Sequence, residues 1–285
     1  MQTKWTFMLN LNFCKLLRPK LVAFAQDSYL DPTTEFIDNE ALPSCVAPIF
    51  GPDLNYGLRR KIPYGSGVGA TEAELKSKIL QLVNIFASDA NTDLTSDLFN
   101  SFLKKNNEVK VFSDQRLNTL ASNHQNIKSF CNRALSAPEH PPITAGQTRI
   151  HQALKNANWS IENINVPINL GVPAFNNGTP FLRSGDYGNG LGLMINGIQY
   201  VYVFATSYNY FPDIEKYIIN LDYYFYDVFG LDDDDLLEFG AKGDGLFSRA
   251  DSVGITAWWQ LQHQFGYAPL VTRCKVSRSY EVAAI

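Results

Sequence analysis

The sequence predicts an α+β protein, in which a helical N-terminal subdomain precedes a C-terminal antiparallel sheet with two helices. Apolar residues recur at a spacing of three to four in residues 71–136, which is typical of helices. From about residue 160 onward they recur at every second position, which is typical of strands. Aromatic residues make up 13% of the 285 residues, which also favours a β-rich part. With 45% apolar and 18% charged residues, the chain can bury a sizeable core.

Residues 1–70 are expected to form an irregular arm with little structure of its own. The segment carries six prolines and ends near the glycine-rich run YGSGVGA. Proline lacks an amide donor and glycine punctuates the chain, so neither suits a long helix or a continuous sheet. Such an arm would lie across the body of the protein or serve as a docking segment.

The helical subdomain is expected to span residues 71–136. Three helices are predicted in it, over residues 71–88, 93–105 and 114–135. Thr71 and Glu74 have the spacing of a capping box, which marks the start of the first helix. The prolines of SAPEHPPITAG cannot continue a helix, so residues 137–150 are expected to be a linker.

The C-terminal domain, residues 151–285, is expected to contain the sheet. Strands are predicted over residues 161–170, 191–195, 198–210, 214–228 and, as one or two strands, the closing stretch 267–285. Asn196-Gly197 is a favoured dipeptide of tight hairpins and is expected to join the second strand to the third. Two helices are predicted after the long strand, at DDDDLLEFG and at VGITAWWQLQHQFG, where Gly266 is placed to end the second.

Composition argues against several classes of function. The net charge is −4 and no long basic run occurs, whereas nucleic-acid binding needs clustered lysines and arginines. The sequence has no run of 18 apolar residues, so no transmembrane helix is predicted. The four cysteines form no CxxC pair and are interpreted as isolated buried thiols; a disulfide would require a location outside the cytosol.

The N-terminal residues do not have the pattern of a signal peptide. The stretch AFAQ at 23–26 resembles a cleavage site, but Arg18, Pro19 and Lys20 stand where the apolar segment should be. If the protein leaves its cell, we expect it to use another route.

Asp227 is the polar exception on an otherwise apolar face of the long strand. Alternation places it on the face opposite to Asp222. A buried carboxylate is costly unless it is paired, hydrogen-bonded or bound to a metal. Two interpretations remain open: Asp227 caps backbone amides where the strand turns at Phe229-Gly230, or it is a functional carboxylate.

The run Asp232–Asp235 also has two interpretations. Acidic side chains are favoured in the first turn of a helix, so the run can be a solvated cap. Four adjacent carboxylates repel one another, so the run can also supply ligands to a cation or groups to a catalytic site. Consecutive helical residues point about 100° apart, however, so all four cannot face one ion.

The residue chemistry suits a hydrolytic site for a phosphate ester. Such a reaction needs charge neutralisation on the phosphate and an activated water. Candidate metal ligands are Asp227, Asp232 and Asp233, and the oxygen ligands favour Mg²⁺. His263 is either a general acid or base, or a structural histidine packed on Trp259 four residues earlier. Candidate substrate-binding residues are Arg249, Arg273 and Trp259.

Two segments, FGLDDDD and WWQLQHQFGYAPLVTR, together resemble a bacterial domain family of unknown function. The likeness covers roughly residues 215–283. Genes of that family often lie beside those for type VI secretion spike proteins. The resemblance implies a toxin delivered into rival bacteria, with a cognate immunity protein and a spike protein or adaptor as partners.

The order of signals is also similar to the colicin M family. GDY at 185–187 precedes paired strands, a strand ending in Tyr226-Asp227, a helix ending in FGY and closing strands. The resemblance implies a curved, partly open β-barrel and magnesium-dependent cleavage of lipid II, with Tyr226 and Asp227 catalytic. The family has a second acidic residue three positions before this aspartate, where the present chain has Tyr224. Asp222 is the candidate to replace that acid. The family's His-Arg pair is absent here, and the aspartate run occupies that region. His263 or Arg249 would then have to supply the missing groups in space.

These observations predict an antibacterial effector that hydrolyses a lipid-linked peptidoglycan precursor with the help of a metal. It would be cytoplasmic in the producing cell, leave without a signal peptide and act in the periplasm of the target cell. The alternative is a non-enzymatic protein, either a membrane-acting toxin or a secretion-spike adaptor. The helices of residues 71–136 are ordinary amphipathic ones rich in Asn, Ser and Lys, which argues against deep membrane insertion.

Overall fold

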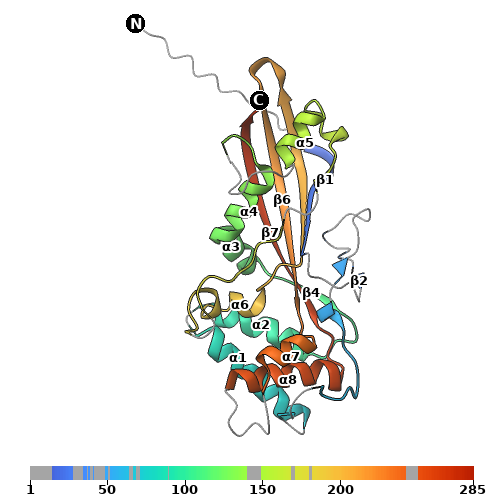
Figure 1. The fold of residues 1–285 in the computed structure, drawn as a ribbon, viewed down its shortest axis with the longest axis vertical. Coiled ribbons are helices and arrows are strands. Elements are labelled where there is room, and N and C mark those ends of the chain that lie inside the picture. The colour runs from blue at the N-terminus through green and yellow to red at the C-terminus, as the bar shows by residue number, and fades with distance from the viewer. Residues whose placement is uncertain are drawn as a thin grey trace.

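A computed structural model gives an elongated molecule built on one curved, non-closed sheet of five strands (Figure 1). It describes the chain apart from residues 1–14, 28–34, 37, 39–40, 42–48, 51, 64–66, 69–70, 89, 140–148, 168–170, 180–181 and 242–249. The predicted α+β class is confirmed.

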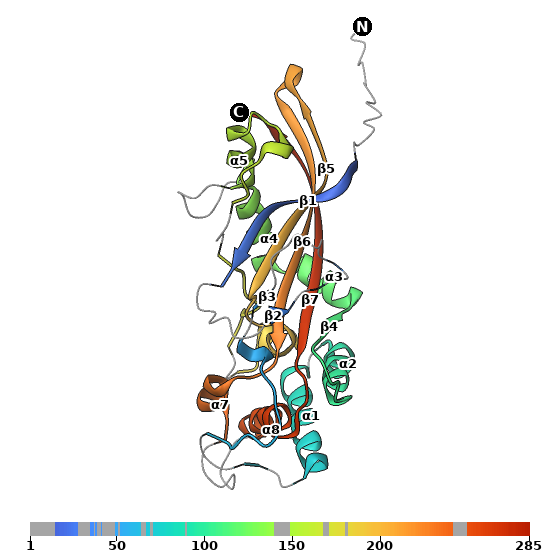
Figure 2. The ribbon, with the colours of Figure 1, turned by 90° about the vertical axis from the view of Figure 1, so that its right-hand side faces the viewer.

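The large sheet has the strand order β1-β5-β6-β7-β4, antiparallel except for the parallel pair β4–β7. Its strands are β1 (Lys15–Gln26), β4 (Lys110–Ser113), β5 (Tyr200–Phe211), β6 (Lys216–Phe229) and β7 (Leu270–Ala283). A second sheet pairs β2 (Glu35–Phe36) with β3 (Ile49–Phe50). The three long strands β5, β6 and β7 form the spine of the molecule (Figure 2).

Helices lie along the sheet and at one end of it. The α-helices are α1 (Glu72–Phe86), α2 (Thr92–Leu103), α3 (Gln115–Asn123), α4 (Gln125–Leu135), α5 (Ile150–Asn156), α6 (Leu191–Met194), α7 (Asp233–Phe239) and α8 (Ala250–Phe265). Short 3-10 turns are η1 (Pro52–Leu54), η2 (Ile161–Asn163), η3 (Gly185–Tyr187) and η4 (Pro212–Ile214). Helices α1, α2, α7 and α8 gather at the end of the molecule opposite the C-terminus (Figure 1).

One hydrophobic cluster joins the helices to the sheet. It contains residues of α1, α2 and α8 together with odd-numbered residues of β6 such as Phe225. A smaller cluster on the other face contains the even-numbered Tyr226 and Val228. Because side chains of a strand alternate between faces, Asp227 belongs to the face that the helices cover.

Most predicted elements are confirmed. The capping box of Thr71 and Glu74 starts α1, and β5, β6, α7, α8 and β7 follow the predicted order. The predicted helix over 114–135 is two helices, because His124 has an extended backbone and its Nδ1 accepts the amide of Asn126 at the start of α4. None of the described helices is both long and apolar enough to cross a membrane.

The prediction of an irregular arm missed three strands, of which β1 is long and β2 and β3 have two residues each. Residues 15–26 form β1, an edge strand paired with β5. Pro19 lies where the register shifts between Lys15 and Lys20, so its missing amide breaks no regular ladder.

The predicted strands over 161–170 and 191–195 are wrong, and so is the predicted hairpin at Asn196-Gly197. Residues 161–167 contain no strand, because the buried Ile161 and Ile164 are three apart and belong to a 3-10 turn and its exit; residues 168–170 lie outside the described part. Residues 191–194 form α6, with Leu191 and Met194 buried. Asn196-Gly197 joins α6 to β5, and neither residue has the positive φ that a type I′ hairpin requires.

Candidate functional site

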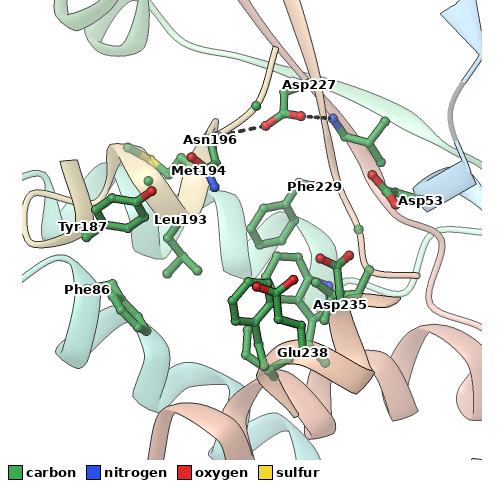
Figure 3. Close-up of a pocket in the computed structure, with 18 of the residues that line it drawn as sticks. Asp53, Phe86, Tyr187, Leu193, Met194, Asn196, Asp227, Phe229, Asp235 and Glu238 are labelled. Atoms are coloured by element: carbon green, nitrogen blue, oxygen red, sulfur yellow. Dashed lines mark hydrogen bonds between the residues drawn. The ribbon is translucent and has the colours of Figure 1, made fainter. Parts of the chain in front are cut away.

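Asp227 lies near the end of β6, where the sheet meets the helices. Its exposed fraction is 9%. The amide of Asn196 donates to Oδ2 and the amide of Val228 donates to Oδ1, both at 2.9 Å (Figure 3). Burial raises the pKa of Asp227 well above its ordinary value, and the nearby charge of Asp53 raises it further against these two hydrogen bonds. Asp227 therefore accepts backbone amides, as the capping interpretation expected, but these are the amides of Asn196 and Val228 and not those of the turn at Phe229-Gly230.

Asp227 lines a cavity of about 700 Å³ between the end of the sheet, α6, α7 and α8. One part of the wall is apolar and contains Phe86, Leu193, Met194, Phe229, Ile255 and Trp258. The acidic lining residues are Asp27, Asp53, Asp227, Asp235, Glu238 and Asp251. Among the described lining residues none is Lys or Arg. In Figure 3 the carboxylates of Asp53 and Asp235 lie across the cavity from Phe86 and Leu193.

Two buried polar atoms of the cavity lining have no hydrogen-bond partner in the described part of the chain. They are Oε1 of Gln199 and Nε1 of Trp258. Gln199 is 7% exposed, and its Nε2 donates to Asp53 Oδ2 at 2.8 Å. A buried oxygen without a partner is costly, so the unpartnered Oε1 of Gln199 needs an explanation.

Asp53, Asp232 and Asp235 offer three carboxylate oxygens within 4.8 Å of one another. Burial, followed by the charges of Asp235 and Asp232, raises the pKa of Asp53 to about 8. Burial is also the main cause that raises the pKa of Asp235 to about 6. Three crowded oxygen ligands of this kind suit a hard divalent cation, which would relieve their repulsion. We call these three residues the carboxylate cluster.

The start of α7 fixes two members of the carboxylate cluster. Asp232 caps the helix by accepting the amides of Asp234 and Asp235, and Asp235 accepts the amide of Asp232 in return. The predicted helix start at the aspartate run is thus confirmed. The capping role and a cation-binding role do not exclude each other, because each carboxylate has two oxygens.

Asp53 comes from a segment that crosses α8, residues 52–63, which we call the strap (Figure 2). The amides of Gly57, Arg59 and Arg60 donate to backbone carbonyls near the C-terminal end of α8 at 3.0 to 3.2 Å. These carbonyls belong to Gln262, His263 and Gln264 and lack partners within the helix. The strap therefore satisfies the helix end and at the same time brings Asp53 to the cavity.

Asp233, a predicted metal ligand, does not join the carboxylate cluster. It forms an ion pair with Arg60 and accepts Nε1 of Trp259 at 3.2 Å. The Arg60 guanidinium lies 5.4 Å from the ring centroid of Trp259. Trp259, a predicted substrate-binding residue, is fully buried in this arrangement and is not among the cavity-lining residues.

His263, a predicted catalytic residue, lies behind the cavity wall. It is 2% exposed, and its Nε2 donates to the carbonyl of Leu231 at 2.8 Å. Its ring lies 4.8 Å from that of Trp259, which is the predicted i, i+4 pair. Burial lowers the pKa of His263, so the neutral form is favoured. This environment matches the structural interpretation of the residue.

Tyr226 and Arg273 meet on the opposite face of the sheet from Asp227. The hydroxyl of Tyr226 donates to Asp38 Oδ2 at 3.0 Å, and Arg273 forms an ion pair with the same oxygen. Burial raises the pKa of Tyr226 well above its ordinary value, with the charge of Asp38 as the next cause. Tyr226 and Arg273, both predicted site residues, therefore bind the buried carboxylate of Asp38, and neither lines the cavity of Asp227.

The remaining predicted site residues are elsewhere. Asp222 forms an ion pair with Lys275 at 2.7 Å and accepts the hydroxyl of Ser277 at 2.6 Å. It is five residues before Asp227 on the same strand, which corresponds to about 16 Å. Arg249 lies outside the described residues. Cys131 and Cys274 are free buried thiols, as expected, and the other two cysteines lie outside the described residues.

Sequence reasoning missed Asp53 and Gln199. Asp53 lies in the segment that was predicted to be an irregular arm, and nothing in the stretch GPDLNYG distinguishes it from an ordinary turn residue. Gln199 falls within the predicted strand 198–210, where nothing in the pattern distinguishes it. A pairing of segments so distant in the chain leaves no signal in a single sequence.

Compared with models of known protein families, with curated proteins and with solved structures, the chain gave no match in any of the three.

Proposed function

We propose that the chain is an antibacterial effector that hydrolyses a phosphate ester of a lipid-linked cell-wall precursor in the cavity of Asp227. One observation carries the proposal: the buried Asp227 shares a cavity with Asp53 and Asp235 of the carboxylate cluster, and no described lining residue is Lys or Arg that could neutralise these acids. Strongly perturbed carboxylates gathered in a cavity are typical of functional sites.

The residues present fit a hard divalent cation such as Mg²⁺. Asp53, Asp232 and Asp235 would hold it, with Asp227 on the neighbouring wall. The cation would neutralise charge on the phosphate and lower the pKa of a bound water. In this proposal Asp227 takes the proton of the attacking water, since its raised pKa makes its carboxylate a stronger base. The apolar wall of Phe86, Leu193 and Met194 offers contact for the lipid part of the substrate.

The target compartment and partners follow from the resemblance to the two bacterial families. We propose that the protein leaves the producing cell without a signal peptide, carried by a type VI spike protein or adaptor. It would act in the periplasm of the target cell, and an immunity protein would protect the producer. Tyr226, Asp222, Arg273 and His263 take no direct part in this proposal, because each has buried or paired contacts away from the cavity.

The proposal is tested by directing the protein to the cytoplasm or, with an added signal, to the periplasm of a test bacterium. Wild type is compared with Asp227→Asn and with Asp222→Asn, which removes the same kind of group from the other face of the sheet. We expect lysis only from the periplasm, lost in Asp227→Asn and kept in Asp222→Asn. Circular dichroism and Tm of the purified variants report whether each is folded.

Toxicity that folded Asp227→Asn retains would refute the enzymatic proposal. Dye release from liposomes by the cation-free protein would then support a membrane-acting toxin. Stable copurification with a spike protein, without toxicity of the chain alone, would support an adaptor.

A further inference from the structure

We infer that Gln262 is a positioning residue that holds Asp53 in the carboxylate cluster and thereby sets its affinity for a divalent cation. The inference rests on the proposed function only in taking the cluster as a cation site. Gln262 is a buried residue that lies outside the cavity lining and touches none of the reacting groups.

Gln262 has no exposed surface and bonds to both sides of the cluster. On the strap side, its Nε2 donates to the carbonyls of Asp53 at 2.9 Å and Asn55 at 2.7 Å. On the other side, its Oε1 accepts the amide of Leu231 at 3.0 Å, and Nε2 also faces the carbonyl of Leu231 at 3.1 Å, so its two hydrogens are shared among three carbonyls. Leu231 directly precedes Asp232. One side-chain amide therefore sets the spacing between Asp53 and the start of α7.

This restraint opposes a force that would move Asp53 away. An oxygen of Asp53 lies within 4.8 Å of oxygens of two other carboxylates, so the charged form of Asp53 is repelled from the place where the strap holds it. A cation would reverse this force, but only if the three carboxylates are already close. Residues that orient metal ligands without touching the metal act in this way, and their loss costs roughly 10–100-fold in metal affinity.

Gln199 provides an independent indication that a ligand belongs here. Its amide lies against Asp53, and its buried Oε1 has no partner in the described part of the chain. An amide oxygen is a good ligand for Mg²⁺ or Mn²⁺. The Gln199 side chain thus borders the carboxylate cluster at Asp53, the residue that Gln262 holds in position.

A matched control exists on the same helix. Gln260 is 5% exposed, its Oε1 accepts the amide of Val68 at 2.9 Å, and its Nε2 donates to Gln264. It therefore also holds an upstream segment on α8, but among the described residues its side chain has no hydrogen bond to Asp53 or Leu231. Replacement of either glutamine by methionine keeps the size of the side chain and removes its hydrogen bonds.

The test measures Mn²⁺ binding to cation-free full-length protein by isothermal titration calorimetry, with electron paramagnetic resonance as a second probe. We expect one site in wild type, affinity within about twofold of wild type in Gln260→Met, and affinity weaker by at least about tenfold in Gln262→Met. Equal loss in both variants, or none in Gln262→Met, would overturn the inference and leave the cation site standing. No binding by wild type would overturn both the cation site and this inference.

A second measurement on the wild type covers the case in which Gln262→Met does not fold. Hydrogen exchange of the backbone amides is followed with and without Mn²⁺. We expect the cation to slow exchange at Gly57, Arg59 and Arg60 of the strap and to leave Val68 unchanged, because binding through Asp53 must stabilise the docked strap. Binding of Mn²⁺ without slower exchange in the strap would overturn the inference.

Discussion

Replacement of Asp53 by asparagine is expected to stabilise the cation-free protein at neutral pH. The pKa of Asp53 is about 8 in the folded protein and near 3.8 when the chain is unfolded. Between these values the folded state keeps a proton that the unfolded state has lost. Stability of the wild type therefore falls as pH rises through this window, by about 1.4 kcal/mol per pH unit. At pH 7 this sets an upper limit of about 4 kcal/mol for the penalty that Asp53→Asn removes.

Asp53 is partly exposed to the open cavity, so we expect about half of that penalty, roughly 2 kcal/mol, to be recovered. For a chain of this size it corresponds to a rise in Tm of about 4 °C. The side-chain amide introduced by Asp53→Asn can still form a hydrogen bond with Gln199, because the unpartnered Oε1 of Gln199 can accept from it after rotation.

The assay is differential scanning calorimetry of both proteins, in a chelator, from pH 4 to pH 8. The Tm difference should be near zero at pH 4 and grow toward pH 8. Asp213→Asn, at an exposed acid in the turn between β5 and β6, is the control and should give no such trend. A difference that is independent of pH, or a variant less stable than wild type at pH 7, would refute the reasoning.

Three further predictions concern the site and its support. Asp235→Asn should weaken Mn²⁺ binding at least about tenfold, whereas Asp233→Asn, outside the cluster, should change it less than about threefold. Equal effects of the two variants, measured by calorimetry, would contradict the assignment of the cluster. Tyr226→Phe should lower stability by about 1 kcal/mol in urea titrations and keep toxicity, and loss of toxicity in folded protein would bring the hydroxyl back into the mechanism. Gly254→Ala should cost about 1–3 kcal/mol, because a Cβ there would lie 2.6 Å from Leu82 between α1 and α8; an unchanged Tm would show that this contact adapts.

Local patterns predicted the elements that depend on local chemistry. The alternation over 214–228 predicted β6, and the acidic turn at Asp232 predicted the start of α7, because strand faces and helix caps are set by neighbouring residues. The same alternation marked Asp227 as a buried polar exception, which is the part of the site that the sequence could show.

The rest of the site depends on contacts between distant segments. Asp53 meets Asp235 only because the strap docks on the end of α8, and its prolines and glycines suggested an arm without fixed structure. Asn196 was assigned to a hairpin turn, whereas its amide donates to Asp227. Four adjacent aspartates could not be sorted by spacing alone, since the partner of each one, such as Arg60 for Asp233, comes from elsewhere in the chain.

Hydrolysis of a purified lipid-linked cell-wall precursor by the purified protein tests the central claim most directly. Wild type, Asp227→Asn and Asp222→Asn are incubated with the precursor, with Mg²⁺ or with a chelator, and the released phosphate-containing product is measured by mass spectrometry. We predict that wild type and Asp222→Asn release product only with Mg²⁺ and that Asp227→Asn releases none. Release by folded Asp227→Asn, or no release by any of the three proteins with Mg²⁺, would contradict the account.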